Sequence, residues 1–186
     1  MPEEHHKKRR AINEAGHAHF ITFSCWKRQP LLSKDRSREW VITAMEKMRE
    51  AQNVAIWAYV IMPEHIHLLI LPREENYEMR RILAALKAPV SRAAKQFLME
   101  RNEQQWLQRL TTKHGHRETF RFWQPGGGFD SNLWSEKPIE NVIDYIHANP
   151  VRRGLVIRPS DWAWSSARAH LGDEGVPLKI DQVDLR

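Results

Sequence analysis

The sequence has little of what builds several common classes of small protein. Its 186 residues include one cysteine, Cys25, so an internal disulfide is excluded, as are zinc modules built from clustered cysteines. Long apolar runs are absent as well, and the start does not have the pattern of a signal peptide. We therefore expect a cytoplasmic protein with no membrane partner, in which any metal site uses histidine, carboxylate or amide ligands.

Acidic residues are fewer than basic residues, and this excess of positive charge favours an anionic partner. The chain carries 29 Lys and Arg against 23 Asp and Glu, giving a formal net charge of +6. This basicity is typical of nucleic-acid-binding proteins but does not prove binding. The length fits one domain. We expect it at residues 18–170, between a basic arm at 1–17 and a tail at 171–186 that either folds over the site or has no role in it.

Apolar periodicity predicts an α+β fold. The expected elements are a strand at 18–26, a helix at 35–50, strands at 54–62 and 65–71, a helix at 79–98 and a strand at 120–123. Pro89 should kink or break the second helix near Ala88, and residues 101–119 should include a loop. This β-α-β-β-α-β order is ferredoxin-like: an antiparallel sheet with both helices on one face and the other face open for a ligand.

A C-terminal helix is expected after the sheet, from Glu136 to Asn149, with Ser135 as its N-cap. It would carry Tyr145 and end before Pro150. The preceding segment, Gly126–Gly128, is either a hinge that lets this helix dock and undock or a plain glycine loop.

His65 and His67 form the first candidate site. Strand alternation places Ile66, Leu68 and Ile70 on one face and both imidazoles on the other. Two neighbouring imidazoles can supply two ligands to a metal ion. The alternative is a half-exposed strand that carries two histidines and binds no metal.

Tyr145 and Asn149 form the second candidate site. They lie four residues apart on the predicted helix, at the border of its apolar stripe. Either residue could serve only in packing or at the helix end. Together with the histidines they indicate chemistry, because a phenol is a weak nucleophile at neutral pH unless a metal or base favours its phenolate. The amide oxygen of Asn149 would complete a set of three metal ligands.

The candidate DNA contacts are Lys87, Arg92, Lys95, Arg121, Arg152 and Arg153. The last two follow the tyrosine closely, where guanidinium groups could bind flanking phosphates. For the three cations on the predicted second helix, the alternative is a solvated helix face. Trp162 and Trp164 would either stack on extruded bases or pack into the core.

Three segments together resemble a known family. His65-Ile66-His67 is similar to the His-hydrophobe-His motif of HUH endonucleases, and Tyr145 lies where single-tyrosine transposases of small bacterial insertion sequences carry their nucleophile. The segments Tyr59–His67, Tyr145–Val156 and Asp161–Ser166, in this order, resemble the REP-associated tyrosine transposase branch of that family. The similarity covers nearly the whole predicted domain.

The resemblance implies an HUH transposase-like catalytic domain that cleaves and rejoins single-stranded DNA beside hairpins. Tyr145 would attack the scissile phosphate to give a 5′-phosphotyrosine link, and His65, His67 and Asn149 would bind Mg²⁺ or Mn²⁺. Many insertion-sequence transposases have Gln at the third ligand position, so Asn149 points to the REP-associated branch and leaves self-mobilisation open. The protein would act as a monomer or homodimer at the bacterial nucleoid.

Two alternatives remain open from the sequence. A domesticated protein that binds hairpin DNA or RNA without cleavage would explain the charge, but it would not need the histidines, the tyrosine and the asparagine together. A histidine-based metal hydrolase of small substrates would explain the histidines but not the basic charge or the tyrosine helix.

Overall fold

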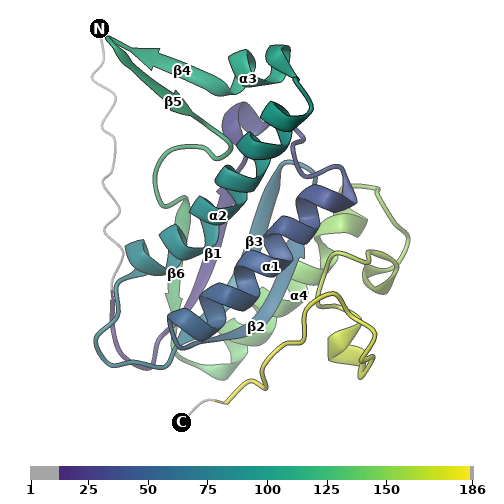
Figure 1. Cartoon of the computed structure of the whole chain (residues 1–186). Coiled ribbons are helices and arrows are strands. Elements are labelled where there is room, and N and C mark those ends of the chain that lie inside the picture. Colours follow the sequence, from purple (N-terminus) through teal and green to yellow (C-terminus); the bar gives the residue numbers. More distant parts are fainter. Residues whose placement is uncertain (1–12, 185–186) are drawn as a thin grey trace, which may run out of the picture.

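The computed structural model describes residues 13–184, so most of the predicted basic arm lies outside it (Figure 1). Its centre is a four-stranded sheet in the order β2-β3-β1-β6, in which all neighbouring strands are antiparallel. The strands are β1 (Ala18–Ser24), β2 (Val54–Ile61), β3 (His65–Pro72) and β6 (Phe129–Leu133).

One face of the sheet is covered by helices α1 (Asp35–Ala51) and α2 (Met79–Glu100) (Figure 1). Ile66, Leu68 and Ile70 of β3 are fully buried against the apolar stripes of these helices. This cluster is the larger of the two hydrophobic cores among the described residues. The ferredoxin-like fold and the alternation along β3 are therefore confirmed.

The opposite face is not fully open, because helix α4 (Glu136–Arg152) lies across part of it. Ile139 and Ile146 of α4 pack with Val60 and Leu69 of the sheet in a second, smaller core. Burying one stripe of an amphipathic helix removes its apolar side chains from water. The predicted tyrosine helix is thus fixed to the face that carries the two histidines.

The fourth strand differs from the prediction. Residues 120–123 do not form the outer strand of the sheet. Trp123 makes only an isolated antiparallel bridge to Cys25, just past the end of β1, and Phe122 and Trp123 are buried in the larger core. The outer position belongs to β6, whose sequence is Phe-Asp-Ser-Asn-Leu. β6 is an edge strand bonded to β1 alone. Such a strand can be mostly polar, which hides it from a search for apolar runs.

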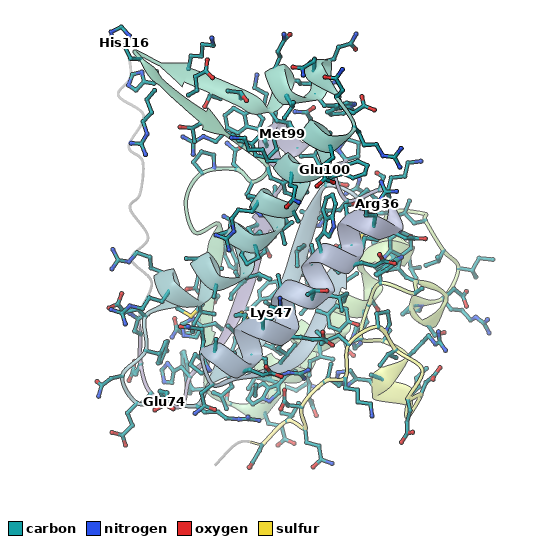
Figure 2. The ribbon with its side chains drawn as sticks, viewed as in Figure 1. Arg36, Lys47, Glu74, Met99, Glu100 and His116 are labelled. Carbon is teal, nitrogen blue, oxygen red and sulfur yellow. The ribbon has the colours of Figure 1, made fainter. Side chains whose placement is uncertain are left out.

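Two further elements lie between α2 and β6, where only a loop is expected. They are helix α3 (Gln104–Leu110) and an antiparallel hairpin of β4 (Thr111–His114) and β5 (Arg117–Phe120). The hairpin projects from the body beyond the end of α2, with His116 at its tip (Figures 1 and 2). These short segments are mostly polar, so they show no strong apolar period.

The helices tolerate internal prolines. α2 runs unbroken through Pro89, and α4 runs through Pro150 to its end. The break predicted near Ala88 and the helix end predicted at Asn149 are both wrong. An internal proline costs about 3 kcal/mol, and the buried apolar stripe of each helix offsets this. Among residues 13–184, every helix is too short or too polar to traverse a lipid bilayer.

The chain after α4 follows the outer edge of β2. Ser165 forms an antiparallel bridge to this strand, and Asp181 accepts a hydrogen bond from its backbone at 2.9 Å. Leu178 is buried in the larger core. The described part of the predicted tail, residues 171–184, therefore packs along β2 and not over the histidines.

Trp162 and Trp164 lie in this segment, between the short 3-10 helices η2 (Pro159–Asp161) and η3 (Ala169–Leu171). Trp162 packs against the smaller core and donates from Nε1 to the carbonyl of Ile61. Trp164 packs against the larger core. The packing alternative is therefore confirmed for both tryptophans.

Candidate metal and nucleophile site

His65 and His67 lie on the sheet face that α4 covers. Both residues are buried, with exposed fractions of 6% and 5%. Their Nε2 atoms lie 3.0 Å apart, so the two rings point at a common position. Two nitrogen lone pairs at this separation repel each other unless a proton or a cation lies between them. This geometry favours a ligand pair over two unrelated histidines on a half-exposed strand.

The outer nitrogen of each ring is held by another residue. His65 Nδ1 lies 3.1 Å from Glu64 Oε1, and His67 Nδ1 lies 2.7 Å from Thr22 Oγ1. An ionised carboxylate only accepts hydrogen bonds, so Nδ1 of His65 donates and its Nε2 carries a lone pair. A hydroxyl can donate or accept, so Thr22 allows His67 either to donate from Nε2 or to direct a lone pair to a cation.

Burial keeps both imidazoles neutral. It lowers the pKa of His65, against the opposing effect of the Glu64 carboxylate. Burial, together with the nearby His65, lowers the pKa of His67 to about 3, against the opposing effect of a hydrogen bond with Asn149. Neutral imidazole is the form that binds metal ions, so both rings are ready to act as ligands at pH 7.

An ion pair joins the start of β3 to the end of α4. Arg153 Nη1 lies 2.6 Å from the buried Glu64 Oε1. Burial raises the pKa of Glu64, but the hydrogen bonds from Arg153 and His65 and the positive charge of Arg153 outweigh it and lower the pKa overall. Glu64 is therefore ionised, and it bridges Arg153 and His65. Arg153, a predicted DNA contact, thus also forms an internal ion pair.

Asn149 and Tyr145 reach the histidines from α4. Asn149 is buried, and its Nδ2 donates to the backbone carbonyl of Tyr145 at 2.7 Å, which leaves Oδ1 for the interaction with His67. Tyr145 is 39% exposed, and its ring centroid lies 5.4 Å from that of His67. The guanidinium of Arg152 lies 5.2 Å from the centre of the same ring. The phenol is therefore accessible, with the histidines on one side and a cation on the other.

The donor set fits a divalent cation. It comprises the two facing imidazole nitrogens and the amide oxygen of Asn149. Within the described part of the chain, no group of three His, Cys, Asp or Glu side chains is placed to hold a metal. The amide oxygen of Asn149 is a donor of another kind beside the two imidazoles. Nitrogen and oxygen donors together suit Mn²⁺ better than Mg²⁺, which prefers oxygen alone.

The predicted DNA contacts fall into two groups. Arg152 and Arg153 lie beside the tyrosine and the histidines. Lys87, Arg92 and Lys95 lie on α2, which packs on the opposite face of the sheet, and Arg121 follows the β4–β5 hairpin. The structure does not bring the second group to the site, and its contact with DNA stays a prediction.

The glycine segment has a packing role. Gly128 has a φ of +84°, and a Cβ built on it would lie 2.2 Å from the backbone oxygen of Thr22. Lys87 donates to the carbonyl of Gly126 at 2.9 Å. The glycines thus let β6 approach β1 beside the threonine that holds His67. The hinge stays an untested prediction.

Thr22 and Glu64 are site residues that the sequence patterns did not indicate. A signal for Glu64 was available, since it precedes His65 directly and metal-binding histidines commonly donate their second N–H to a carboxylate. No local pattern marks Thr22. Only the pairing of β1 with β3, which sets Thr22 opposite His67, brings the two together.

Comparison with known proteins identifies the family of this chain. Residues 14–149 match the family described as "Transposase IS200 like". A Haemophilus influenzae protein, named as a candidate REP-associated tyrosine transposase, is 28% identical over 149 residues, covering 73% of this chain and 76% of that protein. The solved structure of a REP-associated tyrosine transposase bound to a REP hairpin shares the fold, with a TM-score of 0.65 and 22% identity over 100% of this chain and 94% of that one. Because the family match spans residues 14–149, most of the chain, the chain belongs to the IS200-like transposase family and is similar within it to REP-associated tyrosine transposases.

Proposed function

We propose that this protein is a metal-dependent tyrosine transposase that cleaves and rejoins single-stranded DNA beside hairpins. The observation that carries the proposal is an accessible Tyr145 in ring contact with one of two buried, neutral, facing histidines. Membership of the transposase family supports the reaction, and the hairpin bound by the related structure supports the substrate class.

In the proposed reaction, Tyr145 Oη attacks the phosphorus of the scissile phosphodiester. A bond forms between Oη and phosphorus while the bond from phosphorus to the 3′-oxygen breaks. The phenol loses one proton and the leaving 3′-oxygen gains one, which leaves a 5′-phosphotyrosine link and a free 3′-hydroxyl. The link keeps the free energy of the phosphodiester, so an incoming 3′-hydroxyl can reverse the step and join strands without an external energy source.

The other residues hold this arrangement in place. His65, His67 and Asn149 would bind Mg²⁺ or Mn²⁺, which when bound would polarise the phosphate and favour the phenolate. Thr22 and Glu64 orient the two rings. Arg152 supplies positive charge over the tyrosine, where it would hold a phosphate oxygen.

The site is assembled within one chain, which supports activity as a monomer. Light scattering of the protein in complex with DNA distinguishes this from a homodimer. A chromosomal DNA substrate would place the protein at the bacterial nucleoid.

The test is covalent trapping of DNA. Purified protein is incubated with single-stranded oligonucleotides taken from hairpins that flank its gene, with Mn²⁺ or with EDTA, and run on a denaturing gel. We expect a Mn²⁺-dependent adduct that Tyr145→Phe abolishes while DNA binding persists. Tyr77→Phe is the matched control, because Tyr77 lies outside the site and contacts His19.

Two outcomes contradict the proposal. If Tyr145→Phe nicks DNA at the wild-type rate, Tyr145 is not the nucleophile. Tight hairpin binding with no adduct under any metal would favour the domesticated binding protein.

A further inference from the structure

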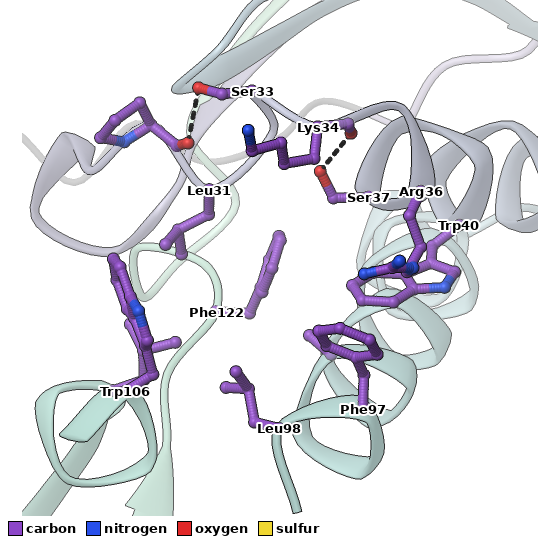
Figure 3. A pocket seen from close by; sticks show the side chains of 13 residues that line it. Leu31, Ser33, Lys34, Arg36, Ser37, Trp40, Phe97, Leu98, Trp106 and Phe122 are labelled. Carbon is purple, nitrogen blue, oxygen red and sulfur yellow. Dashed lines mark hydrogen bonds between the residues drawn. The ribbon is translucent and has the colours of Figure 1, made fainter. Parts of the chain in front are cut away.

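A pocket separate from the histidine site lies on the helix side of the sheet, between the start of α1 and the ends of α2 and α3 (Figure 3). Its volume is about 300 Å³. Its aromatic lining consists of Trp40, Phe97, Trp106 and Phe122, and the exposed cations Lys34 and Arg36 lie at its rim. The chemistry proposed above uses none of these residues.

The pocket offers flat surfaces and few directed hydrogen-bond donors. Figure 3 shows Trp106 on one side and Phe97 with Trp40 on the other. The guanidinium of Arg36 lies 4.2 Å from the centre of the Phe97 ring. The hydroxyls of Ser33 and Ser37 already donate to backbone carbonyls of the lining segment. A flat aromatic ligand would therefore be held by stacking.

The loop that follows β1 connects this pocket to the histidines. Cys25 N donates to Glu64 O and Leu32 N donates to Pro63 O, both at 2.8 Å. The loop therefore packs against the two residues that precede His65. Its next residues, including Leu31 and Ser33, line the pocket.

The same loop carries two exposed cations in a strained conformation. Lys27 and Arg28 both have a φ of 52°, a left-handed conformation that costs a residue other than glycine about 1–2 kcal/mol. Such strain persists where the surrounding structure enforces it, and it is concentrated at binding sites. Positive charge thus lies on the loop that connects the residues before His65 with the pocket.

We propose that the pocket takes one unpaired nucleobase of the DNA strand that passes out of the active site. The phosphates of this strand would cross Lys27 and Arg28 and reach Lys34 and Arg36 at the rim, where charge complementarity favours them. The base would stack against the aromatic walls, Trp106 above all because it is 38% exposed. This inference rests on the proposed function for its substrate.

The lining predicts what the pocket recognises. Every base has a flat π-face, so stacking tolerates any sequence. Because the lining offers few directed donors, the pocket should distinguish a base from no base, but not adenine from thymine.

The test measures binding of full-length protein in EDTA, where no cleavage occurs. The probe is one of the hairpins that flank the gene, extended by a single-stranded thymidine flank in which each position in turn is made abasic or replaced by adenine. We expect one position at which the abasic change weakens binding by roughly 5- to 100-fold, while adenine has little effect. Trp106→Ala should cause the same loss and make the abasic change harmless, whereas Trp106→Phe should retain binding.

A second readout locates the base directly. A 5-iododeoxyuridine at the sensitive position should photocrosslink to Trp106 or Phe122. Leu171→Ala is the control, since Leu171 is 77% exposed and lies outside the pocket.

The inference is overturned if no flank position is sensitive, if Trp106→Ala binds like the wild type, or if this variant instead dissociates a dimer in light scattering. Covalent trapping separates the two proposals. An abasic effect without a Tyr145 adduct would support base binding in the pocket and contradict the proposed cleavage. An adduct without an abasic effect would support cleavage and contradict base binding in the pocket.

Discussion

The two faces of the sheet are built for different purposes. Under α1 and α2, the sheet presents apolar side chains to a large core. Under α4, the core is smaller, and beside it lie the buried polar residues His65, His67 and Asn149. Each of these polar groups has a hydrogen-bond partner, as burial requires. One face therefore carries most of the apolar core, and the other carries the buried polar residues of the proposed site.

Strand β3 belongs to both faces, so it offers the sharpest test of this division. Leu68 and Leu69 are adjacent and fully buried, but they point into different cores. We expect Leu68→Ala and Leu69→Ala each to lower the free energy of unfolding by about 2–5 kcal/mol. Leu68→Ala should form the DNA adduct normally at temperatures where it is folded. Leu69→Ala should also form less DNA adduct, because the cavity left by the side chain weakens the packing of α4 on the sheet.

Denaturant unfolding and the trapping assay measure both effects. Equal loss of adduct in the two variants, after correction for the folded fraction, would contradict the division between the faces.

The glycine segment tests how closely the reactive face is packed. Gly128→Ala combines a left-handed φ with a clash against the Thr22 backbone, so we expect it to cost about 2–4 kcal/mol. Gly126→Ala is the matched control, because φ is also positive there but no described atom lies within 4 Å of the added Cβ. It should cost only about 1–2 kcal/mol. Thermal denaturation of both variants gives the difference, and equal values would argue against a required close approach.

The ion pair between Glu64 and Arg153 tests whether the reactive face depends on its outer hydrogen bonds. Glu64→Gln removes the charge that orients His65, and we expect Mn²⁺ affinity to fall by about 10- to 100-fold. Isothermal titration calorimetry measures this directly. Glu78→Gln, on the surface at the start of α2, should bind Mn²⁺ like the wild type. Unchanged Mn²⁺ affinity in Glu64→Gln would mean that the ion pair with Arg153 only fixes the end of α4 and does not support metal binding.

The smallest expected effect concerns surface charge on the two faces. Arg152→Gln, beside Tyr145, should weaken hairpin binding modestly and reduce the slope of log affinity against log salt by about 1. Arg92→Gln, on α2, should have no such effect if the hairpin lies only on the α4 face. Fluorescence anisotropy over a salt series measures both slopes. A matching loss in Arg92→Gln would extend the DNA-binding surface to the helix face.

Much of this molecule follows from local patterns. The period of two along β3 is enough to place His65 and His67 on the face opposite Ile66 and Leu68. The period of the last helix is enough to place Tyr145 and Asn149 on one edge. Elements with weak local patterns were missed: polar β6, the β4–β5 hairpin, and the continuation of α2 through Pro89.

By itself, the sequence determined the order of the main strands and helices and which side chains share a face, because both depend on residues a few positions apart. Only the tertiary structure decided that α4 lies over the histidines and that Thr22 and Glu64 hold their rings. It alone placed Arg153 in an ion pair with Glu64. It alone also brought Trp106 and Phe122 to one pocket with the start of α1. These contacts join residues far apart in the chain, and they form because the packing of whole elements releases more free energy than any local preference.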